Sequence, residues 1–169
     1  MSHDKKGFTL IELIIVLSIV IVVAGISIPV YNNLKPRYRL NGAARQVTSD
    51  MMWARMQAVS QNNEFMVDFV DAQHKYTILD DNNNNGSVDS GESTVTKNIQ
   101  DEYYDVVFSS TADPIFYPRG IASPGATITL NLLNEDGIKI GTRTVKINLA
   151  GRVKIDEETS NTNSSNSNS

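Results

Sequence analysis

A run of oxygen-bearing side chains between Asp81 and Glu92 has the residue types and the spacing that bind calcium. The segment fits the twelve-residue pattern D-x-[DN]-x-[DN]-G-x₅-E at every required position, with Gly86 at the sharp turn. Calcium prefers carboxylate, amide and carbonyl oxygens as ligands. The expected ligands are the side chains of Asp81, Asn83, Asn85 and Glu92, the carbonyl oxygen of Ser87, and Asp89 through a water molecule.

Strand-like segments flank this loop in place of the paired helices that usually carry the pattern. A calcium ion in such a position would join two strands and stabilise the domain, and we do not expect it to act as a switch. The alternative interpretation is a polar, Asn-rich hairpin tip that binds no ion.

Glu12 is the second residue with a chemical role, because it is the only charged residue in an apolar stretch from Phe8 to Val30. The stretch has about 23 residues, and roughly 20 apolar residues suffice to cross a bilayer as a helix. A buried carboxylate costs about 2.5–3.5 kcal/mol on membrane-insertion scales, so Glu12 needs a partner. The alternative is a plain membrane anchor in which Glu12 extends toward the headgroups.

Lys5 and Lys6 precede the apolar stretch and predict its orientation. Positively charged residues remain on the cytoplasmic side of a membrane helix. We therefore expect a single-pass protein of the cytoplasmic membrane, with its carboxy-terminal domain outside the cytoplasm.

The candidate processing site, Gly7-Phe8-Thr9-Leu10-Ile11-Glu12, lies before the apolar stretch. An ordinary secretory signal has a shorter apolar core and is cleaved after it, so this pattern is of another kind. The residues resemble the type IV prepilin motif. That resemblance implies that a prepilin peptidase cleaves after Gly7 and that Phe8 becomes the methylated amino terminus. It also implies that Glu12 pairs with the amino group of Phe8 in a neighbouring subunit of a filament.

The rest of the chain predicts an amphipathic helix followed by a β-rich domain. Apolar residues recur at three- and four-residue spacing within residues 31–62, which is typical of a helix with one buried face. Within residues 63–156 the alternation changes to the period of strands, over 64–70, 75–79, 105–109, 127–132, 144–149 and 152–155.

The expected fold class is therefore α+β, in which a long amino-terminal helix packs on a mostly antiparallel β-sheet head. The first half of that helix would span the membrane and its second half would be amphipathic. The expected segments are a leader at 1–7, the membrane and filament-core helix at 8–30, the amphipathic helix at 31–62, the head at 63–156 and a disordered Ser/Asn tail at 157–169.

Three further motifs follow in the head. They are a helix end Ala54-Arg55-Met56-Gln57-Ala58, a turn Phe116-Tyr117-Pro118-Arg119-Gly120 and a closing strand Gly151-Arg152-Val153. Their order resembles the minor pilins and pseudopilins of the H-type pseudopilin (GspH) and FimT-like family. The resemblance implies a structural subunit of a type IV pilus or of a type II secretion pseudopilus. It further implies that the chain's partners are other pilin or pseudopilin subunits.

No catalytic function is predicted, because the two histidines, His3 and His74, have no cysteine, nucleophile elbow or phosphate-binding loop beside them. Two alternatives to a minor subunit remain. One is the major subunit of the filament. The other is a tip subunit that binds a surface or DNA through basic residues of the last strands, although a net charge of −4 does not favour nucleic acid. Those basic residues are Lys139, Arg143, Lys146, Arg152 and Lys154.

Overall fold

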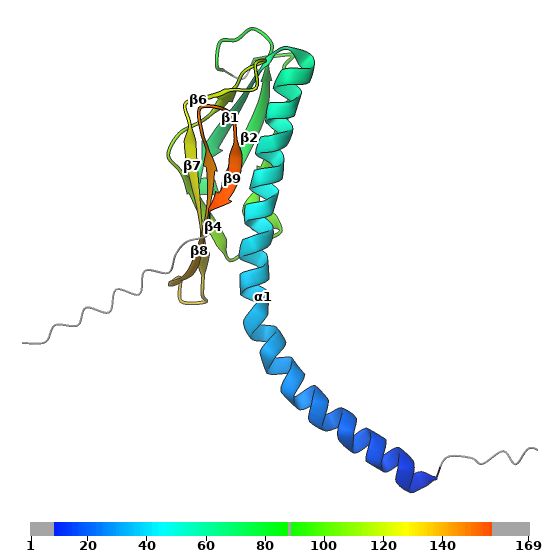
Figure 1. Cartoon of the computed structure of the whole chain (residues 1–169). Coiled ribbons are helices and arrows are strands. Elements are labelled where there is room, and N and C mark those ends of the chain that lie inside the picture. The colour runs from blue at the N-terminus through cyan, green and yellow to red at the C-terminus, as the bar shows by residue number, and fades with distance from the viewer. Residues whose placement is uncertain (1–8, 88, 157–169) are drawn as a thin grey trace, which may run out of the picture. The chain divides into compact units, whose positions relative to one another are not determined.

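The computed structural model describes residues 9–87 and 89–156, and its first element is one long helix, α1 (Leu10–Gln61). The chain divides into two compact units, Met1–Pro36 and Arg37–Ser169. The second unit, which we call the head, holds the end of α1 and all the strands of the described residues. This arrangement confirms the predicted α+β class (Figure 1).

The head contains two antiparallel sheets, which agrees with the mostly antiparallel β-sheet head that the sequence predicted. The first has the order β3-β2-β1-β5-β6, and β1 pairs with β2 from Glu64↔Asp81 to Val70↔Lys75. Two short 3-10 helices, η1 (Asp71–Gln73) and η2 (Ile99–Asp101), follow β1 and β3. The strands of this sheet are β1 (Glu64–Val70), β2 (Lys75–Asp81), β3 (Thr94–Asn98), β5 (Ile115–Phe116) and β6 (Ala122–Ser123).

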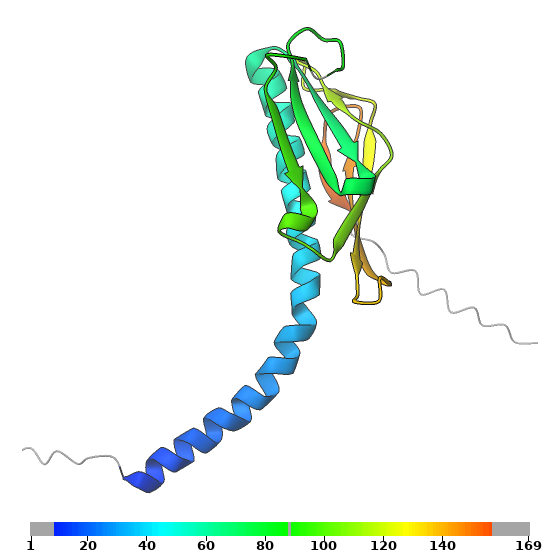
Figure 2. The ribbon, with the colours of Figure 1, turned by 180° about the vertical axis from the view of Figure 1, so that it is seen from behind.

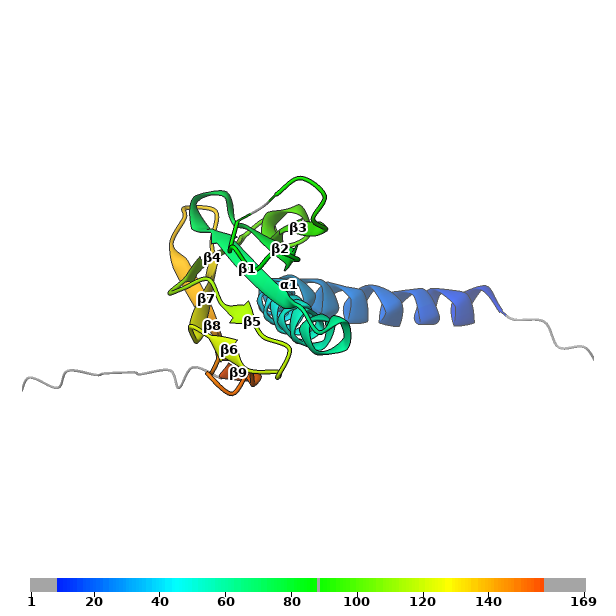
Figure 3. The same cartoon turned by 90° about the horizontal axis from the view of Figure 1, so that it is seen from above.

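The second sheet has the order β4-β7-β8-β9 and is seen beside the first in the view from above (Figure 3). Its longest pairing joins β7 to β8, and every second residue of β7 is buried, as the alternation in the sequence predicted. The strands are β4 (Val106–Ser110), β7 (Ala126–Leu133), β8 (Lys139–Ile147) and β9 (Val153–Asp156).

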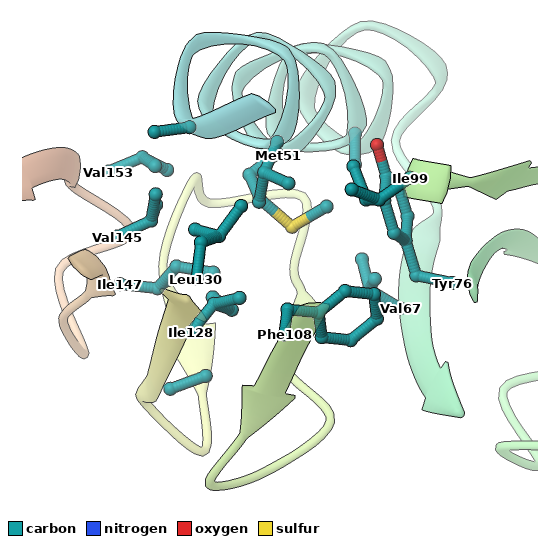
Figure 4. Close-up of a cluster of buried hydrophobic side chains, with 14 of the residues drawn as sticks. Met51, Val67, Tyr76, Ile99, Phe108, Ile128, Leu130, Val145, Ile147 and Val153 are labelled. Carbon is teal, nitrogen blue, oxygen red and sulfur yellow. The ribbon is translucent and has the colours of Figure 1, made fainter. Parts of the chain in front are cut away.

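One face of α1 forms the centre of the hydrophobic core of the head. The residues that the helical spacing selected are buried there, and several of them are alanines, whose small side chains let the sheets approach the helix closely. Met51 points from the helix toward side chains of both sheets, among them Tyr76 and Leu130 (Figure 4). The buried helical residues are Leu40, Ala43, Ala44, Val47, Met51, Ala54 and Ala58.

Polar contacts fix the helix to the strands as well. The Tyr76 hydroxyl donates to Asp50 Oδ2 at 2.5 Å, and Lys97 Nζ lies 2.8 Å from Asp50 Oδ1. Figure 2 shows β3, which carries Lys97, running beside the helix. Burial, together with the neighbouring Asp50 carboxylate, raises the pKa of Tyr76, so the hydroxyl remains a donor. Further toward the start of the head, Arg39 makes a two-pronged ion pair with Asp105.

Candidate functional site

Glu12 lies in the first turn of α1 and has a partner in its own chain. The Thr9 amide donates to Glu12 Oε2 at 3.4 Å, and the Glu12 amide donates to Thr9 Oγ1 at 3.3 Å. This reciprocal pair is a capping box, which satisfies two backbone donors at the start of a helix. The spacing Thr9-x-x-Glu12 is the sequence signature of such a cap. Gly7 and Phe8, the predicted cleavage and methylation residues, lie outside the described residues.

The helical segment after Glu12 presents large apolar side chains to its surroundings. Their exposed fractions run from 49% at Ile14 to 70% at Ile21. Within the part of the chain that the structure describes, no helix meets the length and hydropathy of a membrane span.

The loop from Asp81 to Glu92 begins at the last residue of β2, and its first and last carboxylates accept hydrogen bonds from backbone amides of the loop. The Asp81 side chain, which is buried, accepts the amides of Asn85 at 3.1 Å and of Gly86 at 2.7 Å. Glu92 accepts the amides of Asn82 at 3.1 Å and of Asp89 at 2.9 Å. The loop is therefore wound around its own acidic side chains. Gly86 has φ +70°, a conformation that suits glycine.

The remaining predicted ligands meet inside the same loop. The side-chain amides of Asn83 and Asn85 both donate to Asp89 Oδ2, at 2.8 and 2.5 Å, and these bonds lower the pKa of Asp89. Ser87 donates its amide to Asn85 Oδ1 at 2.7 Å. The structure thus brings Asp81, Asn83, Asn85, Asp89 and Glu92 into one hydrogen-bonded loop. Among the described residues, no group of three or more His, Cys, Asp or Glu side chains is placed to hold a metal ion.

Asn63, between the end of α1 and the start of β1, joins the loop to this connection. The Asn63 side-chain amide donates to Asp80 Oδ1 at 2.6 Å and to Asn82 Oδ1 at 3.1 Å. A rigid loop would therefore restrain the connection between α1 and β1.

The three head motifs, which the sequence related only by their order, meet at one backbone oxygen. Arg55 Nε donates to the carbonyl oxygen of Gly120 at 2.8 Å. Gly151 lies against the same oxygen so closely that a Cβ atom at this position would be 2.1 Å from it. The motifs thus form a junction of α1, the turn before β6 and the turn before β9. Sequence reasoning missed this contact, because nothing local to Arg55 indicates its acceptor.

The basic residues of the last strands do not form one uncompensated surface. Lys146 and Lys154 both form ion pairs with Asp156, the first at 2.7 Å. Arg143 donates to Asn41 Oδ1 at 2.9 Å. Among the five basic residues considered for DNA binding, therefore, two share one carboxylate and a third is held by the helix.

Family models match most of the chain. The model described as type II transport protein GspH matches residues 43–151, and the prokaryotic N-terminal methylation motif matches residues 2–28. The pilin-like protein PilA1 of Thermus thermophilus is 30% identical over 164 residues, which cover 90% of this chain and 99% of PilA1.

Solved structures of low sequence identity share the fold. The minor pseudopilin EpsH of the type 2 secretion system of Vibrio cholerae is 10% identical, with a TM-score of 0.54, covering 69% of this chain and 95% of EpsH. The type IV minor pilin FimU of Pseudomonas aeruginosa is 19% identical, with a TM-score of 0.51, covering 72% of this chain and 90% of FimU.

Proposed function

The chain belongs to the GspH family of pilin-like proteins, and from this premise we propose that it is a minor subunit stored in the cytoplasmic membrane and processed before assembly. Members of the family are structural subunits of a type IV pilus or a type II secretion pseudopilus, so the chain is a filament subunit and not an enzyme. It assembles with other pilin subunits.

The observation that carries the proposal is the N-terminal methylation motif at residues 2–28, which includes most of an apolar segment with one carboxylate. A prepilin peptidase would cleave between Gly7 and Phe8 and leave the apolar segment on the mature chain. That segment would cross the membrane once, with the head outside the cytoplasm, as Lys5 and Lys6 indicate. In the filament, the same segment would pack among the corresponding segments of neighbouring subunits.

Glu12 would pair with the amino group of Phe8 in a neighbouring subunit, because an opposite charge at the same depth relieves the cost of a buried carboxylate. The capping box supports this role, since it holds the Glu12 side chain at the start of the helix. The capping box also gives Glu12 a structural role at the helix start. A test must separate that role from the pairing with the neighbouring amino group.

Three variants make that separation in the full-length chain. Glu12→Gln keeps the capping bond and removes the charge, Thr9→Ala weakens the cap and keeps the charge, and Glu12→Ala removes both. We expect all three to be cleaved after Gly7, as mass spectrometry of the mature amino terminus would show. We expect Thr9→Ala to enter sheared filaments, and both Glu12 variants to be absent from them or strongly reduced.

Normal incorporation of Glu12→Gln would refute the charge pairing. Failure of Thr9→Ala alone would assign the effect to the cap. An uncleaved wild-type chain would remove the proposed processing altogether.

We also propose that the Asp81–Glu92 loop binds calcium in the extracytoplasmic space. The hydrogen-bonded loop supports this proposal, because the side chains of Asn83 and Asn85 already meet Asp89, and Asp81 and Glu92 bind backbone amides of the same loop. Amide oxygen and nitrogen atoms exchange places by a flip of the side chain, so Asn83 and Asn85 can present oxygen atoms to an ion. An affinity of about 10⁻⁴–10⁻³ M suffices for an extracellular module.

Isothermal titration of calcium into the detergent-solubilised full chain tests this site. We expect binding that Glu92→Gln abolishes and that the matched control Ser90→Ala, at a loop position without a ligand role, leaves unchanged. An equal heat signal from both variants, or no signal from the wild type, would contradict the calcium site.

A further inference from the structure

A pocket of about 310 Å³ lies between the beginning of the helical part of the head and β8, near the turn that joins β7 to β8 (Figure 1). Two arginines line it together with apolar side chains, and no acidic residue belongs to its lining. Neither arginine forms an ion pair within the residues that the structure describes. Two positive charges therefore share one concave site. The side chains that the site presents are Arg37, Leu40, Leu132, Ile140 and Arg143.

An irregularity in the pairing of β7 with β8 forms one side of the pocket. The register shifts after Leu132, which pairs with Gly141, so Ile140 has no partner across the ladder. An extra residue of this kind bends its strand, and Ile140 is 55% exposed. A Cβ atom at Gly141 would lie 3.3 Å from Leu40 Cδ2, so a larger residue there would crowd the lining.

The two arginines differ in how firmly they are held. Arg143 Nε donates to Asn41 Oδ1 at 2.9 Å, and its Nη1 donates to the carbonyl oxygen of Thr142 at 3.0 Å. A guanidinium has five N–H donors, so three remain for a ligand. The Arg37 side chain is exposed and makes no hydrogen bond to another described residue. A fixed and a movable guanidinium can enclose one phosphate group, which arginine binds through paired N–H···O bonds.

The surroundings of the pocket suit a membrane surface. Tyr38 and Tyr104 are 67 and 70% exposed, and the Tyr104 ring centroid lies 4.7 Å from Arg39 Cζ. Tyrosine is enriched where a membrane meets water, because its ring is apolar and its hydroxyl is polar. The acidic residues of the β7–β8 turn, Glu135 and Asp136, do not line the pocket. A ligand with a phosphate group and an apolar portion therefore fits this site better than a free anion.

The pocket is also close in the sequence to the apolar stretch from Phe8 to Val30. Only residues 31–36 separate Val30 from Arg37, and seven residues of a helix span about 10 Å. The headgroups extend about 5–8 Å beyond the hydrocarbon core on each side of a bilayer. If the apolar stretch crosses the membrane, Arg37 would lie at the outer edge of the headgroups.

We propose that this pocket binds the phosphate group of a phospholipid in the outer leaflet of the cytoplasmic membrane. Arg37 and Arg143 would bind the phosphate oxygens, while Leu40 and Ile140 would contact the glycerol and the first acyl carbons. The bound lipid would hold the head at one height until the chain leaves for the filament. The inference rests on the proposed function, because it requires a chain that is stored in the membrane.

Native mass spectrometry of the detergent-solubilised full-length chain, titrated with dioleoyl phosphatidylglycerol, measures this binding. We expect one lipid per chain to be retained. Dioleoylglycerol has the same acyl chains and lacks the phosphate, so it should not be retained. Inorganic phosphate should bind more weakly than the phospholipid, because it makes no apolar contacts.

Variants of the lining connect the binding to the pocket. Arg37→Gln should weaken the apparent affinity for the phospholipid about tenfold, because a hydrogen bond to a charged group is lost. The matched control Arg119→Gln removes an exposed arginine from the turn that contacts α1 at Arg55, and it should leave the affinity unchanged. Ile140→Asp, which places a carboxylate in the pocket, should weaken binding more than Ile140→Asn does.

Three outcomes would overturn the lipid site. They are equal affinities of Arg37→Gln and the wild type, equal retention of dioleoylglycerol, and inorganic phosphate that binds as tightly as the phospholipid. The wild-type chain in cells tests the proposed function separately. If that chain is uncleaved after Gly7 or absent from the membrane fraction, the proposed function fails whatever the titration shows. A cleaved, membrane-bound chain that retains no phospholipid would refute the pocket alone.

Discussion

The two halves of α1 differ in their surroundings, although they belong to one continuous helix. Between Leu10 and Val22 the large apolar side chains are exposed, whereas the face between Leu40 and Ala58 is buried in the head. The head half is therefore stabilised by contacts within the chain, and the amino-terminal half offers its apolar surface to other molecules. The comparison predicts that substitutions in the head half change folding, and that those in the amino-terminal half change assembly.

Two neighbouring methionines give the largest expected contrast. Met51 is fully buried, whereas Met52 on the outer side of the same turn is 53% exposed. Met51→Ala should lower the free energy of unfolding by about 2–5 kcal/mol, because it leaves a cavity in the core. Met52→Ala should change it by less than about 0.5 kcal/mol. Urea unfolding of the solubilised chain, followed by the fluorescence of its single tryptophan, Trp53, measures both. Equal effects would contradict the assignment of the buried face.

The junction of the three motifs provides a contrast between two glycines with similar backbone angles. Gly151 and Gly137 have φ of +71° and +74°, but only at Gly151 would a Cβ atom meet another group. Gly137→Ala should cost about 1–2 kcal/mol, because only the left-handed conformation opposes it. Gly151→Ala should cost more, about 3 kcal/mol, since the Gly120 carbonyl must also move. The same urea titration ranks the stabilities of the two variants. A larger loss of stability in Gly137→Ala would show that the Gly120 carbonyl moves aside at little cost.

Asp50 tests whether a polar contact matters as much as the packing around it. Asp50→Ala removes the acceptor of both Tyr76 and Lys97 and should lower the free energy of unfolding by about 1.5–3 kcal/mol. Lys97→Met removes the ion pair and keeps the buried Tyr76 bond, so its effect should be smaller. If the two variants were equally destabilised, the ion pair would account for the whole effect and the buried bond for none.

The smallest expected effect concerns Asp156, whose pKa is lowered by hydrogen bonds from Lys146 and Lys154. A carboxylate with a lowered pKa in the folded state stabilises the fold above its ordinary pKa of about 3.9, and this contribution is lost as the pH falls below it. Asp156→Asn should therefore be slightly less stable than the wild type near neutral pH and equal to it in acid. The pH dependence of the urea midpoint measures this difference. A stability difference between variant and wild type that grew in acid would contradict the prediction.

Patterns with a regular period allowed most of the head to be predicted from the sequence. The strand at Glu64–Val70 and the buried face of α1 follow from alternation and helical spacing. The strand β3 was missed, because its residues Thr94–Asn98 lie at a sheet edge and show no apolar alternation. The strands β5 and β6 have two residues each, which is too short for any period.

The candidate sites differ in how far the sequence could specify them. The calcium pattern lies within twelve consecutive residues, so local spacing was enough to select its ligands. The strand predicted for 144–149 instead ends at Ile147, because Gly151 donates its amide to the carbonyl oxygen of Asn148 and turns the chain. That turn leaves Leu149 exposed, and the resulting surface depends on residues from three distant segments. Only the folded chain brings them together.

The bond from Arg55 to Gly120 also implies an order of events while the chain is being made. Arg55 leaves the ribosome before Gly120, and Gly151, which packs against the same carbonyl oxygen, follows later still. Such distant pairings form late, since a long loop must close before they gain stability. The helix of the head therefore remains incompletely anchored until the chain has been synthesised beyond Gly151.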